Sequence, residues 1–301
     1  MMVYLEEFTL PDGRAEDEFI LSGHEKLECG CYNVNDSYPF KIFVKKSLSE
    51  IRFDPITIFC GSNGSGKSTL LQVIAKRLGV SHSGTSPVGA LMDEYVGLCR
   101  EKISPRIGRI PDGSRLLRSD DVFDLLLDSR SVNRSINEER EELFKEYKRV
   151  KDTKYADSPF ISFDQLDELK HRNEVLRSTR SAYTERRLVK SVLAGSNGES
   201  AYKYFTDKIE EGALYLLDEP ENSLSPTLTV KLMEHLENAV RFFGCQLIVA
   251  THSPFLLGLR GARIYDLDST PVTVREYGEL ECVKVYTDFF KKRIKRDTGM
   301  D

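Results

Sequence analysis

The sequence has 301 residues, of which 40% are hydrophobic and 30% are charged, and it contains no tryptophan. A chain of this length and composition can bury a substantial core, which excludes an intrinsically disordered protein. The formal net charge of −5 excludes the global basic footprint of many nucleic-acid-binding domains and leaves only a local one open.

Residues 1–60 predict short strands joined by turns. Pro11-Asp12-Gly13 has the composition of a turn, and residues 40–44 (FKIFV) alternate like a half-buried strand. Residues 56–60 (ITIFC) form a short apolar run rich in β-forming residues, and glycines follow at once. This pattern indicates a buried strand of a parallel sheet.

The middle of the chain is predicted to be helical. Residues 68–78 (STLLQVIAKRL) carry apolar positions at helical spacing, and Gly79 is a suitable stop. From about 121 to 194 the pattern is helical and highly charged, with an exposed helix at 138–151 and a second, longer pattern at 163–193.

Strands and helices alternate again after Gly198. Residues 213–217, 247–250 and 264–267 read as strands. Ser225 and Pro226 are expected to cap and start a helix that runs to residue 243 and stops at Gly244.

This alternation predicts an α/β fold with a mostly parallel core sheet. We expect residues 1–80 and 200–301 to form one α/β lobe, with antiparallel strands at its N-terminal end. Residues 81–199 are expected to form an inserted helical lobe.

The strongest motif is a complete phosphate loop of the form G-x-x-x-x-G-K-[ST]. An apolar strand precedes it and an amphipathic helix follows, so its context also fits. Glycines let successive amides point at phosphate oxygens, and the helix dipole adds positive charge there. Lys67 is expected to neutralise the outer phosphates, and the Ser68 hydroxyl to ligate Mg²⁺. The nine residues of the motif are Gly61, Ser62, Asn63, Gly64, Ser65, Gly66, Lys67, Ser68 and Thr69.

A second motif ends the apolar strand at 214–217 with Asp218, Glu219 and Pro220. It places two carboxylates at the carboxyl edge of the sheet, where ligands bind. We expect Asp218 to reach the Mg²⁺ shell through water and Glu219 to polarise the attacking water as a general base.

These two motifs, followed by Ala250-Thr251-His252-Ser253, resemble the ATP-binding-cassette (ABC) ATPase superfamily. That superfamily includes transporter engines and soluble SMC-type and DNA-repair ATPases. The resemblance covers residues 53–75 and 190–260 well and the rest loosely. The stretch PFLLGLRGARIYDLD looks most like small, stand-alone bacterial ATPases of the AAA and ABC-like group rather than transporter subunits.

The resemblance implies further site residues. Ser196-Asn197-Gly198-Glu199-Ser200 looks like the signature motif, usually L-S-G-G-Q, although the register differs and Glu199 replaces Gln. Ser196 and Gly198 would then touch the γ-phosphate held by the opposite subunit, and Glu199 would bind nucleotide with them. The resemblance also implies that the lobe of residues 1–80 and 200–301 is a nucleotide-binding lobe of RecA-like type. His252 matches the switch histidine that contacts the γ-phosphate, and residues 221–225 match the D-loop between subunits.

Two parts of the family pattern stay open. No glutamine stands at a strand end to serve as the glutamine-loop. Residues 118–123 could take its place, with Asp120 near Mg²⁺; the alternative is that Asp120 caps a helix. The adenine-stacking aromatic could be Tyr32, Tyr38 or Phe40.

In this family the signature cannot fold back onto its own nucleotide, so the resemblance implies a homodimer with two sandwiched ATP molecules. Binding would close the dimer and hydrolysis would open it. We expect an ATP hydrolase with ATP and Mg²⁺ as cofactors.

Two functions remain open. One is a soluble ATPase that processes DNA or licenses an effector protein, such as a nuclease or toxin, in bacterial defence. The basic run at 291–296 could touch phosphate backbone, or it could be a solvated tail. The alternative is the nucleotide-binding subunit of an ABC transporter, against which the missing glutamine and the atypical signature count.

The location of the protein follows from features that its sequence lacks. No apolar run approaches the roughly 18 to 20 residues that span a bilayer, and the start lacks the pattern of a signal peptide. We therefore expect a cytoplasmic protein. Of the six cysteines only Cys29 and Cys31 are close, which favours free thiols over a zinc site, with Cys60 and Cys245 as small buried hydrophobes.

Overall fold

In the computed structural model, residues 2–21, 38–82, 91–127, 140–145, 148 and 196–298 are described. The chain divides into two compact units. One unit contains residues Met1–Val122 and Asn197–Asp301, and the other contains Phe123–Ser196. Among the described residues, no helix combines the length and apolar character that crossing a membrane requires.

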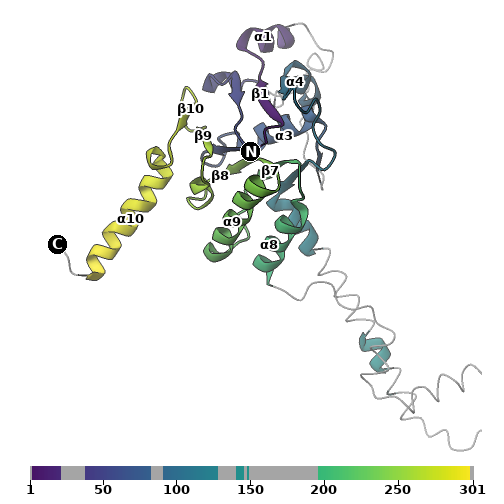
Figure 1. Cartoon of the computed structure of the whole chain (residues 1–301), viewed down its shortest axis with the longest axis vertical. Helices are drawn as coiled ribbons and strands as arrows, with labels where there is room; N and C mark the ends of the chain where they lie inside the picture. The colour runs from purple at the N-terminus through teal and green to yellow at the C-terminus, as the bar shows by residue number, and fades with distance from the viewer. Residues whose placement is uncertain are drawn as a thin grey trace, which may run out of the picture. The chain divides into compact units, whose positions relative to one another are not determined.

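A seven-stranded sheet in the order β10-β9-β3-β8-β7-β6-β4 forms the centre of the first unit (Figure 1). All neighbours are parallel except β10, which is antiparallel to β9. Every residue of β3, β7 and β8 is buried, as their continuous apolar runs predict for strands covered on both faces. The strands of this sheet are β3 (Ile56–Cys60), β4 (Ser81–His82), β6 (Arg115–Arg118), β7 (Leu214–Asp218), β8 (Gln246–Thr251), β9 (Arg263–Asp266) and β10 (Thr273–Arg275).

A smaller antiparallel sheet comes mainly from the N-terminal part of the chain. Its order is β2-β1-β5, with β1 at Leu5–Thr9, β2 at Glu50–Arg52 and β5 at Arg100–Ile103. The expected fold class, a mostly parallel α/β sheet with N-terminal antiparallel strands, is therefore confirmed.

The helices begin and end largely where their caps predict. Gly79, with φ of 63°, ends α3, and the Ser225 side chain accepts a hydrogen bond from the amide of Leu228 at the start of α9. Residues 119–127 and 140–145 are also helical. The elements with complete bounds are α1 (Gly13–Leu21), η2 (Val44–Lys46), α3 (Lys67–Leu78), α4 (Met92–Leu98), α8 (Asn197–Lys208), α9 (Pro226–Phe242), η4 (Leu256–Gly258), η5 (Tyr277–Glu279) and α10 (Glu281–Thr298).

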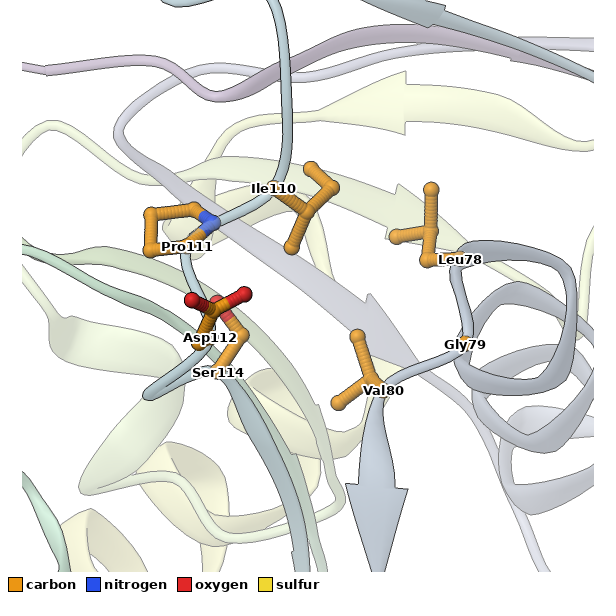
Figure 2. A pocket seen from close by; sticks show the side chains of 7 residues that line it. All are labelled: Leu78, Gly79, Val80, Ile110, Pro111, Asp112 and Ser114. Atoms are coloured by element: carbon orange, nitrogen blue, oxygen red, sulfur yellow. The ribbon is translucent and has the colours of Figure 1, made fainter.

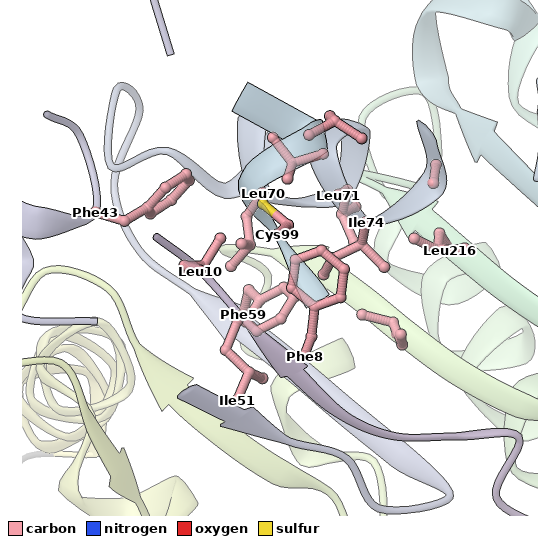
Figure 3. Close-up of a cluster of buried hydrophobic side chains, with 14 of the residues drawn as sticks. Phe8, Leu10, Phe43, Ile51, Phe59, Leu70, Leu71, Ile74, Cys99 and Leu216 are labelled. Atoms are coloured by element: carbon pink, nitrogen blue, oxygen red, sulfur yellow. The ribbon is translucent and has the colours of Figure 1, made fainter. Parts of the chain in front are cut away.

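The main hydrophobic cluster lies between the small sheet, α3 and one face of the core sheet (Figure 3). Phe8, Phe59 and Leu70 are fully buried there. From β7, Leu216 joins this cluster, whereas the adjacent Tyr215 is equally buried but points to the opposite face, because strand side chains alternate. This packing fixes the position of α3 against the sheet and hence the loop that precedes it.

One buried side chain ties the two sheets together. Gln246 on β8 accepts hydrogen bonds from the amides of Tyr4 (2.8 Å) and Leu5 (2.9 Å) and donates to the Leu5 carbonyl (2.9 Å). This side-chain amide thus joins the start of β1 to β8.

Two local predictions are wrong. Residues 40–44 are not a strand but turns that lead into η2, because Phe40 and Phe43 both enter the core, which needs a helical spacing of three. Asp12 does not simply mark a turn; its carboxylate accepts from the amide of Ala15 (2.8 Å) and starts α1.

The boundary between the units also differs from the expected one at residues 81–199. Strand β6 pairs with β7 inside the core sheet, so residues up to Val122 belong to the first unit, and so do Asn197 to Glu199. The strand was missed because its four residues, RLLR, show no alternation. The predicted helices at 138–151 and 163–193 lie mostly outside the described residues.

Candidate functional site

Four parallel strands end beside one another and bring the predicted motifs together. Cys60 of β3 pairs with Thr251 of β8, and Asp218 of β7 pairs with Ala250 of β8 and Arg118 of β6. The segments that follow these strands therefore meet at the carboxyl edge of the sheet, where open α/β folds bind ligands.

The loop between β3 and α3 is tightly curled. Gly64 and Gly66 have φ values of 81° and 97°, in the left-handed region that glycine adopts without strain. A Cβ on Gly61 would lie 2.5 Å from the Ser65 hydroxyl oxygen, so the backbone approach needs glycine. Within the described part of the chain, that buried hydroxyl has no hydrogen-bond partner. Such a loop at a helix N-terminus fits a phosphate.

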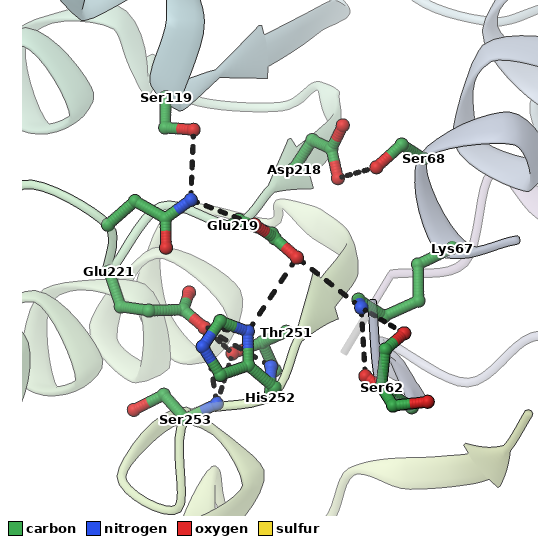
Figure 4. A network of polar contacts seen from close by, with 12 residues as sticks. Ser62, Lys67, Ser68, Ser119, Asp218, Glu219, Glu221, Thr251, His252 and Ser253 are labelled. Carbon is green, nitrogen blue, oxygen red and sulfur yellow. Dashed lines mark hydrogen bonds and ion pairs between the residues drawn. The ribbon is translucent and has the colours of Figure 1, made fainter. Parts of the chain in front are cut away.

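Lys67 holds its charge over this loop. Its side chain is only 3% exposed, and its Nζ donates to the carbonyls of Gly61 (2.8 Å) and Ser62 (3.1 Å). Glu219 Oε1 lies 3.3 Å from the same nitrogen (Figure 4). The buried ammonium is thus compensated by oxygen atoms at the place where phosphates would lie.

Ser68 and Asp218 form a pair of oxygen ligands. The Ser68 hydroxyl donates to Asp218 Oδ1 at 2.9 Å. Burial raises the pKa of Asp218 to about 6, and the hydrogen bond from Ser68 acts against this rise. These residues fit Mg²⁺, which takes one or two carboxylates and completes its shell with phosphates and water. Across the described ranges, no cluster of three or more His, Cys, Asp or Glu residues could hold a metal ion by itself. A metal ion at Ser68 and Asp218 would therefore need phosphate and water as further ligands.

Glu219 is held in a distinct position directly after β7. Its φ is 47°, and its amide donates to the Ala250 carbonyl at 2.9 Å. Asn222 Nδ2 donates to Glu219 Oε2 at 2.8 Å, and His252 Nδ1 lies 3.6 Å from Oε1. Burial by itself raises the pKa of Glu219, but the hydrogen bond from Asn222 and the charge of Lys67 outweigh it and lower the pKa overall. The carboxylate is therefore ionised and oriented, as a base must be.

Glu221 organises the turn after β8. Its Oε1 accepts from the Thr251 hydroxyl and from the amides of His252 (3.2 Å) and Ser253 (3.1 Å). His252, whose side chain is 45% exposed, thereby faces both Glu219 and Glu221, at 3.6 and 3.7 Å. The predicted switch histidine thus lies in the same network as the predicted base.

The segment expected to replace the glutamine-loop contributes Ser119 to this network. It starts at the end of β6, and Asn222 Nδ2 donates to the Ser119 hydroxyl at 3.5 Å. Asp121 is buried and pairs with Arg118 at 3.4 Å, whereas Asp120 is exposed. The structure therefore joins Ser119, not Asp120, to the network.

The signature-like residues lie at the start of α8. Ser196 precedes this helix, and Gly198 and Glu199 stand in its first turn. A Cβ on Gly198 would lie 3.2 Å from the Ser223 carbonyl, so glycine allows α8 to approach the segment after Glu219 closely. Gly198 therefore lies beside the segment that follows Glu219.

Of the aromatic candidates for adenine, Phe40 is excluded because it is 3% exposed and packs on Phe19 and Tyr95 in the core. The Tyr38 hydroxyl donates to Thr69 at 2.9 Å, which places this ring next to α3. Tyr32 lies outside the described residues.

Several contacts were not foreseen from the motifs. Asn222 and Glu221 fall in the D-loop match, but their hydrogen bonds to Glu219 and to the switch turn became visible only in the fold. Asp268 was missed entirely; it accepts from the amide and hydroxyl of Ser62, both at 2.8 Å. No sequence signal links residues 206 positions apart.

A cavity of about 230 Å³ lies elsewhere (Figure 2). Its lining includes Val80, which precedes β4, and Ser114, which precedes β6, so it opens at the amino ends of these strands. Asp112 is its one titratable lining residue. The predicted chemistry lies at the other edge of the sheet.

Comparison with known proteins gives a family match. A model described as "AAA domain, putative AbiEii toxin, Type IV TA system" matches residues 109–258, a range that holds β6, Asp218-Glu219 and His252 but not the phosphate loop. No curated protein matches the chain in sequence.

Solved structures are matched at low identity. One is a metal-chelate type ABC transporter in an inward-facing conformation, with 16% identity, 78% of this chain and 77% of that chain covered, and a TM-score of 0.35. Another is a cobalt transport ATP-binding protein, with 17% identity, coverage of 76% and 72%, and a TM-score of 0.32. The phosphate loop, the Asp218-Glu219 pair beside it and the family match over residues 109–258 together support an ABC-like P-loop ATPase.

Proposed function

We propose that the chain binds ATP with Mg²⁺ at the carboxyl edge of the core sheet and hydrolyses it to ADP and phosphate. The observation that carries this proposal is one connected network: Lys67 and His252 both face Glu219, while Ser68 bonds to Asp218. A phosphate anchor, a metal-ligand pair and a base thus lie within one site.

Each residue has a distinct part in the proposed reaction. The amides of the phosphate loop and Lys67 bind and neutralise the phosphate chain, and Ser68 and Asp218 supply oxygen ligands. When bound, Mg²⁺ would balance the negative charge of the β- and γ-phosphates. Glu219, kept ionised by Asn222 and Lys67, orients a water molecule and accepts its proton. His252 stands beside Glu219, where it can donate a hydrogen bond to the γ-phosphate.

The proposal includes a homodimer that closes around two ATP molecules. The support is that Gly198 and Glu199 stand in the first turn of α8 and that Gly198 lies beside the segment after Glu219. A helix N-terminus favours an anion, so the γ-phosphate of a second subunit's ATP is a suitable ligand. Removal of this phosphate by hydrolysis would weaken the closed state.

We further propose that this cycle licenses an effector protein or drives work on nucleic acid. The matching family's description names a toxin of a type IV toxin–antitoxin system, which supports a role in defence. DNA titration of the ATPase rate separates the two partners. A rate that rises with DNA and loses this response at moderate salt supports nucleic acid, and a rate indifferent to all DNA forms supports an effector protein.

The experiment that tests hydrolysis compares Glu219→Gln with Glu234→Gln, a matched change on the exposed side of α9. Loss of the base should lower phosphate release by about 10²–10⁴-fold, the range typical of general-base catalysis. Glu234→Gln should keep the wild-type rate. Phosphate release that is unchanged in Glu219→Gln would refute the assignment of the base.

A further inference from the structure

Two cysteines from distant parts of the chain meet beside the phosphate loop. Cys60 Sγ and Cys282 Sγ are 3.8 Å apart although 222 residues separate them in the sequence. Cys60 is the last residue of β3 and directly precedes Gly61, and Cys282 is in the first turn of α10. Both are free thiols in this structure.

The fold fixes the positions of the two thiols. The Leu267 amide donates to the Cys60 carbonyl at 2.8 Å, which fixes the end of β3 against the chain that leaves β9. Leu280 and Val283, on either side of Cys282, are 1% and 5% exposed and anchor the first turn of α10. The contact is therefore set by packed elements rather than by a chance approach of surface side chains.

The two thiols differ in access and acidity. Cys60 is 4% exposed, whereas Cys282 is partly exposed. The hydrogen bond with Cys60, helped by backbone amides at the start of α10, lowers the pKa of Cys282 to about 7, although burial opposes this. The same contact and burial raise the pKa of Cys60. A reactive thiolate at the surface next to a protonated thiol in the interior is the arrangement found in redox-sensing pairs.

We propose that Cys60 and Cys282 form a reversible disulfide in response to a peroxide, with Cys282 as the thiol that reacts first and Cys60 as the one that resolves it. The inference concerns the thiols alone and does not depend on ATP hydrolysis.

The chemistry balances in two steps. The Cys282 thiolate attacks one peroxide oxygen, the O–O bond breaks, and Cys282 becomes a sulfenic acid while the other oxygen leaves and takes up a proton as water. The Cys60 sulfur then attacks the sulfenic sulfur, the S–O bond breaks, and hydroxide leaves as a second water with the proton from Cys60. The two thiols lose two electrons in total, and hydrogen peroxide is reduced to two water molecules.

The sulfur atoms must approach from 3.8 Å to the roughly 2.05 Å of a disulfide. Because β3 is central and buried, we expect the first turn of α10 to make most of this movement. The product would join the strand that enters the phosphate loop covalently to the C-terminal helix.

The test treats the reduced full-length protein with one equivalent of hydrogen peroxide and maps its peptides by mass spectrometry. We expect a cross-linked Cys60–Cys282 peptide that is two hydrogens lighter than its parts and that disappears with dithiothreitol. Cys99 and Cys245, both buried and free, serve as internal controls and should remain thiols.

Two variants assign the order of reaction. In Cys60→Ser, dimedone should trap a persistent sulfenic acid on Cys282. In Cys282→Ser, peroxide consumption should fall by about tenfold or more, and Cys60 should stay unmodified. The Cys282→Ser result stands alone if Cys60→Ser does not fold, because Cys282 lies partly at the surface.

Absence of the cross-linked peptide while both thiols persist would overturn the proposal. So would equal cross-linking among all cysteines, or oxidation of Cys60 in Cys282→Ser at the wild-type rate.

Discussion

Asp218 and Glu219 are adjacent in the sequence, yet their environments move their pKa values in opposite directions. Asp218 is 8% exposed, and burial dominates its pKa. Glu219 is more open, and Asn222 and Lys67 overcome its burial. This difference supports Asp218 as the proposed cation ligand and Glu219 as the proposed base.

Asp218→Asn should stabilise the protein without ligands. The pKa of Asp218 is raised from 3.8 to about 6, so the folded state binds more protons between these pH values and loses stability as pH rises through this window. Removing the charge should recover about 1–3 kcal/mol at pH 8 and little at pH 4. Thermal melts of both proteins at the two pH values check this, and a lower melting temperature of Asp218→Asn at pH 8 would contradict it.

Asn222→Ala should act on Glu219 rather than on the fold. The variant removes the hydrogen bond to Glu219 Oε2, which is part of what lowers the pKa of Glu219. The acid limb of the ATPase pH profile should then move to higher pH. The free energy of unfolding should change by no more than about 0.5 kcal/mol. Asn222→Asp should move it further, because it adds a like charge. A profile that keeps its acid limb in both variants would remove Asn222 from the positioning of the base.

At the scale of elements, the strands and helices around the site follow from local patterns. The ITIFC and LYLLD runs are buried on both faces, so continuous apolar sequence predicts them. The helix ends follow in the same way: Gly79 ends α3, and Ser225 with Pro226 starts α9. Each of these signals stands in the sequence directly at the helix end that it sets.

Elements whose stability comes from distant contacts could not be predicted in this way. Strand β6 is four residues long and is defined by its place beside β7, and the FKIFV segment alternates but folds into turns. The KKRIKR run, read as a site for phosphate or as a solvated tail, lies on a regular helix, α10. Within the site, Asp268 and Ser119 show the same limit, since their partners are far along the chain.

Gln246→Leu should uncouple the two sheets. The substitution keeps the volume but leaves the amides of Tyr4 and Leu5 and the Leu5 carbonyl buried without their partner. We expect a loss of about 2–4 kcal/mol in the free energy of unfolding, because each unsatisfied buried group costs about 1–3 kcal/mol and partial relaxation recovers some of it. Urea unfolding measures this directly. A loss below about 0.5 kcal/mol would show that β1 is held by its other contacts.

At the scale of the whole molecule, the proposed cycle requires two copies of the chain to meet through a nucleotide. Lys67 contacts Glu219 and Ser68 bonds to Asp218 in one site of this chain, while Gly198 and Glu199 stand in the first turn of α8. A ligand that binds only the closed state shifts the population toward it.

Glu219→Gln should therefore form a stable dimer with ATP and Mg²⁺. Light scattering after size-exclusion chromatography should show the mass doubling with ATP and returning to that of a monomer with ADP. Adding Ser196→Arg should restore the monomer while ATP still binds, because the new side chain would fill the space for the γ-phosphate. A Glu219→Gln protein that stays monomeric at saturating ATP contradicts the sandwich.

The most direct measurement is calorimetric titration of Mg²⁺ and a non-hydrolysable ATP analogue into the wild type, Lys67→Ala and Lys76→Ala. Lys76 lies on the same helix, α3, and pairs with Asp93 at 2.7 Å on the surface, so its loss controls for helix effects. We expect one site per chain in the wild type and in Lys76→Ala, and affinity at least about 100-fold weaker in Lys67→Ala. Equal affinity in all three proteins would show that the phosphate loop does not hold the nucleotide.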